Sequence, residues 1–141
     1  MDKKQQQAVW QRVMDGPRSR EDGFDLFVPA LTLNNAYRQL SGTLPGAKRL
    51  YEEQTDTVCC LKGLMRLAGR TVPSPRAPPM GQQSQEKLLL FCYRQSRQAA
   101  AEYLARSADP ETGIVFRHLS DRQIAHCTML ATLLGKGKGQ G

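Results

Sequence analysis

YEEQTDTVCCLKGLMRLAG, residues 51–69, is the stretch that decides the fold. It is rich in Leu, Glu, Lys and Met and contains no proline, which is typical of an α-helix. Residues spaced three or four apart lie on the same side of a helix, and together with the leucine just before the stretch they form one continuous face. That face consists of Leu50, Gln54, Thr57, Leu61, Leu64 and Ala68. A face that should bury hydrocarbon therefore carries an amide and a hydroxyl one turn apart.

The rest of the chain contains more helical patterns and no sustained alternation typical of a strand. Residues 24–42 form one long helix, capped by Asp25 and with Pro29 near the first turn, where proline is tolerated. Its core-facing positions are Leu26, Ala30, Leu33, Tyr37 and Leu40. Residues 3–14 add a short N-terminal helix, whose apolar side is Val9, Trp10 and Val13.

Two further long helices are predicted in the second half of the chain. Ser84 caps the helix over residues 85–108, and its core-facing positions are Leu89, Cys92, Ser96, Ala99 and Tyr103. Asp109 and Pro110 start the last helix, residues 111–135, and Gly135 ends it. Its core-facing positions are Phe116, Leu119, Gln123, His126, Leu130 and Leu133.

The connections between these helices predict the topology. Gly42, Pro45 and Gly46 make a short turn, so the first two long helices should lie antiparallel. Residues 69–83 hold four of the eight prolines, which predicts an extended crossover. At about 3.1 Å per residue, about twelve extended residues span the same length as a helix of about 24 residues. The expected fold is an all-α, four-helix bundle with one long Pro-rich crossover between the second and third long helices.

We expect a single domain over residues 1–141. Residues 1–24 are assigned to the N-terminal helix and linker, 25–135 to the four-helix bundle and 136–141 to a flexible tail. No apolar run approaches the roughly 20 residues needed to span a bilayer, and the N-terminus lacks the apolar core of a secretion signal. A cytoplasmic location is therefore expected.

The net charge and the spacing of the cysteines bear on two kinds of function, nucleic-acid binding and thiol chemistry. The net charge of +7 invites a nucleic-acid hypothesis, but the basic residues are spread along the chain and do not interleave with aromatic residues. Nucleic-acid binding is thus the second alternative only. The four cysteines form no C-x-x-C pair and are interpreted as buried structural thiols.

The two halves of the chain repeat one spacing. Tyr37 follows Ala30 by seven residues, and Thr57 follows Gln54 by three; in the second half, Tyr103 follows Ser96 by seven residues and His126 follows Gln123 by three. This pattern resembles the ferritin-like superfamily, particularly its rubrerythrin-type branch, in which E-x6-Y followed by E-x2-H occurs twice. Residues 109–135 are also similar to the last helix of that family, and the resemblance covers roughly residues 25–135.

The resemblance implies two iron or manganese ions held by glutamates and histidines. The positions that it assigns to these ligands are Ala30, Gln54, Thr57, Ser96, Gln123 and His126. Only the histidine is retained, so the core-facing positions offer no carboxylate to balance two dications. We therefore expect no bound metal and no catalytic residue. We expect instead a buried polar network of Tyr37, Gln54, Thr57, Ser96, Tyr103, Gln123 and His126.

The expected function is a binding or assembly module, whose partner is another protein or a second copy that buries Trp10 in a homodimer. The first alternative is a rubrerythrin-like di-iron or di-manganese oxidoreductase that borrows Glu52, Glu53 or Asp56, although Glu53 lies about 100° off the core face. A mononuclear site of His126 with Cys92 or Cys127 is a further alternative, and so are redox-active tyrosines. His118 is placed outside the core face, exposed and with no partner that would make it catalytic.

Overall fold

The computed structural model describes residues 3–5, 24–69 and 83–139. Four long helices make up most of this part: α2 (Phe24–Ser41), α3 (Lys48–Leu67), α4 (Gln85–Arg106) and α5 (Gly113–Gly139). A 3-10 turn, η3 (Pro45–Ala47), leads into α3. The described residues contain no strand, which confirms the all-helical prediction for this part of the chain. The apolar side of the predicted N-terminal helix and residues 70–82 of the crossover lie outside the described residues.

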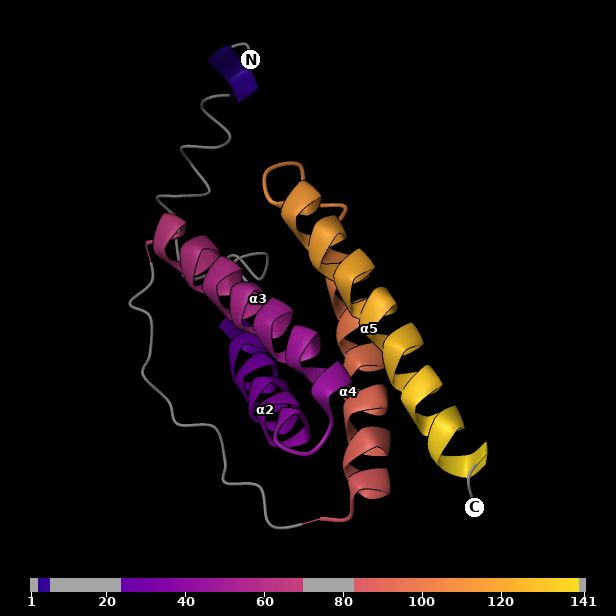
Figure 1. The fold of residues 1–141 in the computed structure, drawn as a ribbon. Helices are drawn as coiled ribbons and strands as arrows, with labels where there is room; N and C mark the ends of the chain where they lie inside the picture. Colours follow the sequence, from indigo (N-terminus) through magenta and orange to yellow (C-terminus); the bar gives the residue numbers. More distant parts are fainter. Residues whose placement is uncertain (1–2, 6–23, 70–82, 140–141) are drawn as a thin grey trace.

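The helices pack as two hairpins, α2 with α3 and α4 with α5 (Figure 1). The hairpins meet chiefly where α2 packs against α4. Helices α3 and α4 run in the same direction, so the end of α3 and the start of α4 lie at opposite ends of the molecule. The chain between them therefore joins opposite ends, whereas η3 and the loop before α5 are short connections.

Local signals explain the starts of α4 and α5 and the end of α3. The Ser84 hydroxyl accepts a hydrogen bond from the Lys87 amide at 3.3 Å, which is the predicted cap of α4. Gly69 follows α3 with φ of 78°, a left-handed conformation that glycine adopts without steric cost. The Asp109 carboxylate accepts from the Thr112 amide and hydroxyl just before α5. Side chains that accept from free amides thus set the starts of α4 and α5.

Several predicted helix ends differ from those in the structure, among them the start of α3 and both ends of α5. Helix α3 begins at Lys48 rather than Tyr51, because η3 ends at Ala47 and the next residue already has α-helical backbone angles. Helix α5 begins at Gly113 rather than at residue 111, after the turn that Asp109 holds. It also continues through Gly135 to Gly139. Glycine weakens a helix by about 1 kcal/mol but ends it only where it turns left-handed, and Gly135 has no positive φ.

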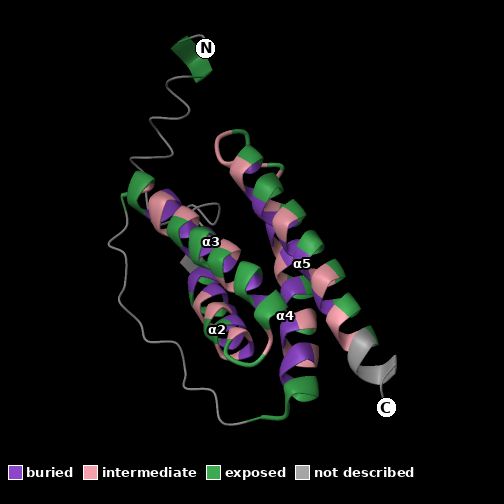
Figure 2. Cartoon of the chain, in the orientation of Figure 1, coloured by how far each residue is buried: buried purple, intermediate pink, exposed green. Residues whose placement is uncertain are grey.

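The interior consists of two apolar clusters, one toward each end of the molecule. Figure 2 shows buried residues recurring along all four long helices. The first cluster is Leu26, Phe27, Ala30, Val58, Leu61, Leu64, Met65, Tyr103, Phe116 and Leu119. The second is Leu33, Ala36, Tyr37, Leu40, Ala47, Leu50, Leu88, Leu89, Cys92 and Leu130. On α3, α4 and α5, buried polar residues separate the two clusters along the helix.

The length and apolar character of a helix decide whether it can cross a membrane. Within the described ranges, none of the helices combines the length and the apolar character that crossing a bilayer requires.

Candidate functional site

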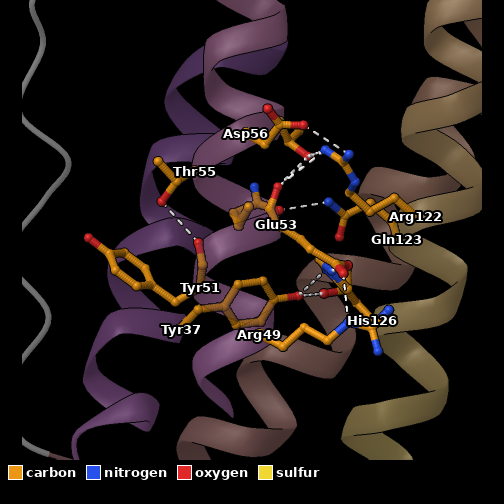
Figure 3. Close-up of polar contacts among 12 residues, drawn as sticks. Tyr37, Arg49, Tyr51, Glu53, Thr55, Asp56, Arg122, Gln123 and His126 are labelled. Carbon is orange, nitrogen blue, oxygen red and sulfur yellow. Dashed lines mark hydrogen bonds and ion pairs between the residues drawn. The ribbon is translucent and has the colours of Figure 1, made fainter. Parts of the chain in front are cut away.

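The buried polar residues and their contacts form a layer across the middle of the molecule, which we call the central polar layer (Figure 3). Its members are Tyr37, Glu53, Gln54, Thr57, Ser96, Arg122, Gln123 and His126. The amide and hydroxyl on the core face of α3 belong to this layer. Gln54 and Thr57 are both fully buried, so their polar atoms need partners inside the protein.

One chain of hydrogen bonds takes a residue from each long helix. Ser96 of α4 contacts the Tyr37 hydroxyl of α2, which lies 3.4 Å from His126 Nδ1 of α5. His126 Nε2 then lies 2.9 Å from Glu53 Oε1 of α3. The Tyr37 and His126 rings also meet edge to face, with centroids 5.4 Å apart. This chain of contacts ties all four helices together at one level.

The protonation of this chain follows from burial and charge. Burial lowers the pKa of His126, and its hydrogen bond with Glu53 offsets this only in part, so the imidazole is neutral at pH 7. A carboxylate can only accept, and therefore His126 Nε2 carries the proton and donates to Glu53. His126 Nδ1 is then an acceptor for the Tyr37 hydroxyl, and Ser96 donates to the Tyr37 oxygen in turn.

Glu53 is the only carboxylate in the central polar layer, and it is half-buried. Burial by itself raises the pKa of Glu53, but hydrogen bonds from Arg49 and His126 outweigh that effect, so the pKa lies below its usual value. Arg49 Nε donates to Glu53 Oε2 at 2.8 Å. The two carboxylate oxygens are thus engaged by different donors, one cationic and one neutral.

A second chain of hydrogen bonds joins two glutamine amides. Gln54 Nε2 donates to the Ala30 carbonyl at 3.1 Å, and Gln123 Nε2 donates to Gln54 Oε1 at 2.7 Å. Gln123 Oε1 is buried and, within the described residues, has no hydrogen-bond partner. The pair therefore links α2, α3 and α5 but leaves one acceptor unsatisfied, which is costly in a buried setting.

Arg122 brings a guanidinium to the edge of the layer. Its Nη1 donates to the Glu53 carbonyl at 3.2 Å and to the Thr57 hydroxyl at 3.0 Å. Its Nη2 pairs with Asp56 at 2.9 Å. The Arg122 side chain is only 14% exposed, whereas the Asp56 side chain is exposed, and the three contacts together join α5 to α3.

The predicted network is therefore divided in the structure. Tyr37, Ser96 and His126 lie in one chain of contacts, and Gln54 and Gln123 lie in the other. Thr57 bonds to Arg122 and to the Glu53 carbonyl. Tyr103 is buried but stacks on Phe116 with centroids 6.3 Å apart, and no hydrogen bond joins it to the other six predicted members.

Several residues outside the predicted core faces have contacts that the sequence reasoning missed. Glu53 was placed off the core face, yet its carboxylate reaches His126. Arg122 was not singled out, and its Nη2 lies 3.1 Å from Nε2 of His118, which was predicted to be exposed. A signal was present, because Glu53 and Arg122 each directly precede a buried glutamine in the two matching hairpins.

The four cysteines are free thiols, and the prediction that all are buried was wrong. Cys92 is fully buried, and burial raises its pKa to about 12. Cys59 is exposed, because it lies on the outer face of α3. Among the described residues, no three His, Cys, Asp or Glu side chains come together as a metal-binding set, and this applies equally to His126 with Cys92 or Cys127.

A pocket of about 210 Å³ opens between α2 and α4 and reaches the central polar layer at Gln54. Its buried inner wall is formed by Leu26, Ala30, Leu33, Gln54 and Tyr103. Asp25, Gln98 and Glu102 lie among the more exposed outer lining. No Lys, Arg or His lines the pocket, although the whole chain carries a net charge of +7.

Comparison of the chain with protein-family models, with curated proteins and with solved structures finds no match. The chemistry of the site is therefore interpreted from its own residues and contacts.

Proposed function

We propose that this chain is a ferritin-like, rubrerythrin-related helical bundle that has lost di-metal chemistry and acts as a binding module. One observation carries the proposal: the residues at the positions of carboxylate ligands are neutral, and those with polar side chains bond to neighbours within the protein. Gln54 and Gln123 pair at 2.7 Å, and Ser96 bonds to Tyr37. Two dications would need several carboxylates, whereas the layer offers Glu53 alone, already engaged by Arg49 and His126.

The pocket between α2 and α4 is the proposed binding site. It is lined by Ala30 and Gln54, which occupy two of the six positions that correspond to metal ligands in the resemblance. A glutamate at position 30 would place its carboxylate in or beside this space, and alanine leaves the space open. The same substitution that removes a metal ligand therefore supplies room for a small organic ligand.

The lining of the pocket favours a small amphipathic cation, such as an arylalkylammonium. The inner wall is largely apolar, with leucine side chains and the Tyr103 ring, so it suits an aromatic or alkyl body. Asp25 and Glu102 stand at the outer part, and one guanidinium, Arg106, bonds to both. Two carboxylates against one cation leave a negative charge, which attracts an ammonium group and repels an anion.

Binding of phenethylamine to the full chain tests this function, with hydrocinnamate as the anionic analogue of similar shape. In two-dimensional NMR spectra, phenethylamine should shift the amide signals of α2 and α4 residues around the pocket, and hydrocinnamate should not. Ala30→Leu should abolish these shifts by filling the pocket. The matched variant Ala101→Leu, at an exposed position on α4, should retain them. Equal shifts with both compounds, or with Ala30→Leu, would overturn the proposed site.

The second candidate function is a di-metal oxidoreductase, and one observation favours it. Glu53 and His126 are 2.9 Å apart at the centre, and both side chains are metal ligands in many proteins. Against it, the described residues contain no set of three such ligands, and Arg49 already pairs with the Glu53 carboxylate. Metal loading distinguishes the two functions.

A further inference from the structure

Tyr103 borders the pocket between α2 and α4, and its hydroxyl forms no hydrogen bond with any other described residue. We propose that this hydroxyl selects the ligand: the pocket takes an arylalkylamine that carries a hydroxyl on its ring, and Tyr103 bonds to that hydroxyl. The inference rests on the pocket being the binding site proposed above, and it names the second polar group of the ligand.

The first step of the argument compares the two halves of the chain. Tyr37 follows Ala30 by seven residues in the first half, and Tyr103 follows Ser96 by the same number in the second. Across the molecule, the Tyr37 hydroxyl bonds to Ser96. The matching partner of Tyr103 would be residue 30, which is alanine and has no polar side-chain atom. Ala30 and Tyr103 belong to the same apolar cluster and both line the pocket, so the pocket lies where this partner is missing.

The second step concerns access to the Tyr103 hydroxyl. In the described part of the chain, the completely enclosed side-chain nitrogen and oxygen atoms without a hydrogen-bond partner are Arg106 Nε and Gln123 Oε1. The Tyr103 hydroxyl also lacks a partner and is not one of these atoms, so it is not completely enclosed, although the residue is only 1% exposed. Because Tyr103 forms part of the inner wall, the pocket is the route by which a small molecule reaches this hydroxyl.

The third step concerns the hydrogen bonds that the inner wall can still make. Burial raises the pKa of Tyr103 well above the usual range, so the hydroxyl keeps its proton at neutral pH and can both donate and accept. Gln54, the other polar residue of the inner wall, already uses its amide on the Ala30 carbonyl and on Gln123. Tyr103 is therefore the group of the inner wall whose hydrogen bonds are left for the ligand.

The two sides of the pocket then receive the two polar ends of one molecule. Asp25 and Glu102 in the outer lining attract the ammonium group, and the leucine side chains of the inner wall pack against the ring. The ring hydroxyl gives up its water on entering, which is costly unless a new hydrogen bond replaces it. Tyr103 supplies that bond, just as Ser96 bonds to Tyr37 in the other half. The ligand class is thus the phenolic arylalkylamines, and tyramine is the probe.

Titration of the full chain, followed by the amide NMR signals of α2 and α4, tests the proposal on the unaltered protein. Tyramine should bind about three- to tenfold more tightly than phenethylamine, which is the range for one net hydrogen bond. Para-methylphenethylamine has nearly the size of tyramine but no hydroxyl, and it should bind more weakly than tyramine. Equal binding of these two compounds would overturn the proposal, because size rather than the hydroxyl would then set the affinity.

Three variants locate the preference for tyramine over phenethylamine. Tyr103→Phe removes a hydroxyl that has no partner in the fold, so the protein should stay folded and bind both amines equally. Tyr93→Phe makes the same change on α4 at a partly buried position outside the pocket lining, and it should keep the preference. Ala30→Ser supplies to Tyr103 the hydroxyl that Ser96 supplies to Tyr37, and it should weaken the preference.

The outcomes separate this inference from the binding function on which it rests. Binding of phenethylamine at the pocket without a preference for tyramine would overturn the inference and leave the proposed function standing. Failure of both amines to shift the signals around the pocket would overturn both. A preference that persists unchanged in Tyr103→Phe, or that disappears in Tyr93→Phe, would overturn the assignment of the preference to Tyr103.

Discussion

His126 Nε2 and Glu53 Oε1 lie 2.9 Å apart, and this contact joins α5 to α3 at the level where the two apolar clusters are interrupted. The imidazole is neutral at pH 7, so the contact is a hydrogen bond to a carboxylate rather than an ion pair. It fixes which nitrogen of His126 is protonated and leaves the other nitrogen to accept from Tyr37. The contact thereby orients the whole chain of hydrogen bonds from α4 to α3.

The protein should lose stability as the pH falls below about 6.5, the usual pKa of histidine. The folded-state pKa of His126 is lowered, so the unfolded chain binds a proton that the folded chain resists, and acid favours unfolding. Glu53 acts in the same direction below about 4.5, because its folded-state pKa is also lowered. Urea unfolding midpoints measured between neutral pH and mild acid should therefore decrease.

Two histidine variants test whether His126 causes this dependence of stability on pH. His126→Gln should flatten the decrease just below neutral pH, because it removes the group that resists protonation. His118→Gln, at an exposed position on the same helix, should leave the decrease unchanged. A decrease that persists in His126→Gln and disappears in His118→Gln would contradict the role given to His126.

The glutamine pair should respond asymmetrically to substitution. Gln54→Met leaves Gln123 Nε2 unpaired, beside an Oε1 that already lacks a partner, and one newly unpaired buried group costs about 1–3 kcal/mol. Gln123→Met leaves only Gln54 Oε1 unpaired and also removes the acceptor that already lacks a partner, so it should cost less.

The double variant completes this comparison. Gln54→Met with Gln123→Met replaces both partners by apolar groups and should cost less than Gln54→Met alone. Chemical denaturation of the four proteins gives the free energies of unfolding. If the two single losses were equal and added up in the double variant, the two amides would not be coupled as the structure has them.

Arg122 should contribute more to stability than Arg117, the other arginine of α5. Arg122→Met removes two hydrogen bonds and the pair with Asp56 from a side chain that is only 14% exposed, and should cost about 1–3 kcal/mol. Arg117→Met, whose pair with Asp121 is exposed, should change the free energy of unfolding by less than about 0.5 kcal/mol. Similar losses in thermal or urea unfolding of these two variants would argue against the bridging role of Arg122.

Periodicity in the sequence predicted the helices and the level of the polar layer. Gln54, Thr57, Gln123 and His126 are buried because a period of 3.6 residues places them on the same faces as the surrounding leucines. Ser84 marked the start of α4 because its hydroxyl replaces the missing intrahelical acceptor. These features depend on positions along a single helix, and such positions can be read from the sequence.

The partners of the polar groups could not be predicted in the same way. A helical period places the Cα atoms, but long side chains such as Glu53 and Arg122 carry their polar groups around the helix toward the core. Which glutamine meets which carbonyl depends on how α3 and α5 are aligned with each other, and this alignment follows from packing across the molecule. The division of the layer into two chains of hydrogen bonds was therefore beyond sequence reasoning.

The central proposal is that neutral hydrogen-bonded side chains stand where a di-metal bundle would hold its ligands, and metal loading tests it most directly. Full-length protein is incubated anaerobically with excess ferrous iron or manganese, freed of unbound metal, and measured by elemental analysis. The structure predicts substoichiometric metal that is unaffected by Glu53→Gln. About two ions per chain, the content of a di-metal bundle, lost on Glu53→Gln, would contradict the account.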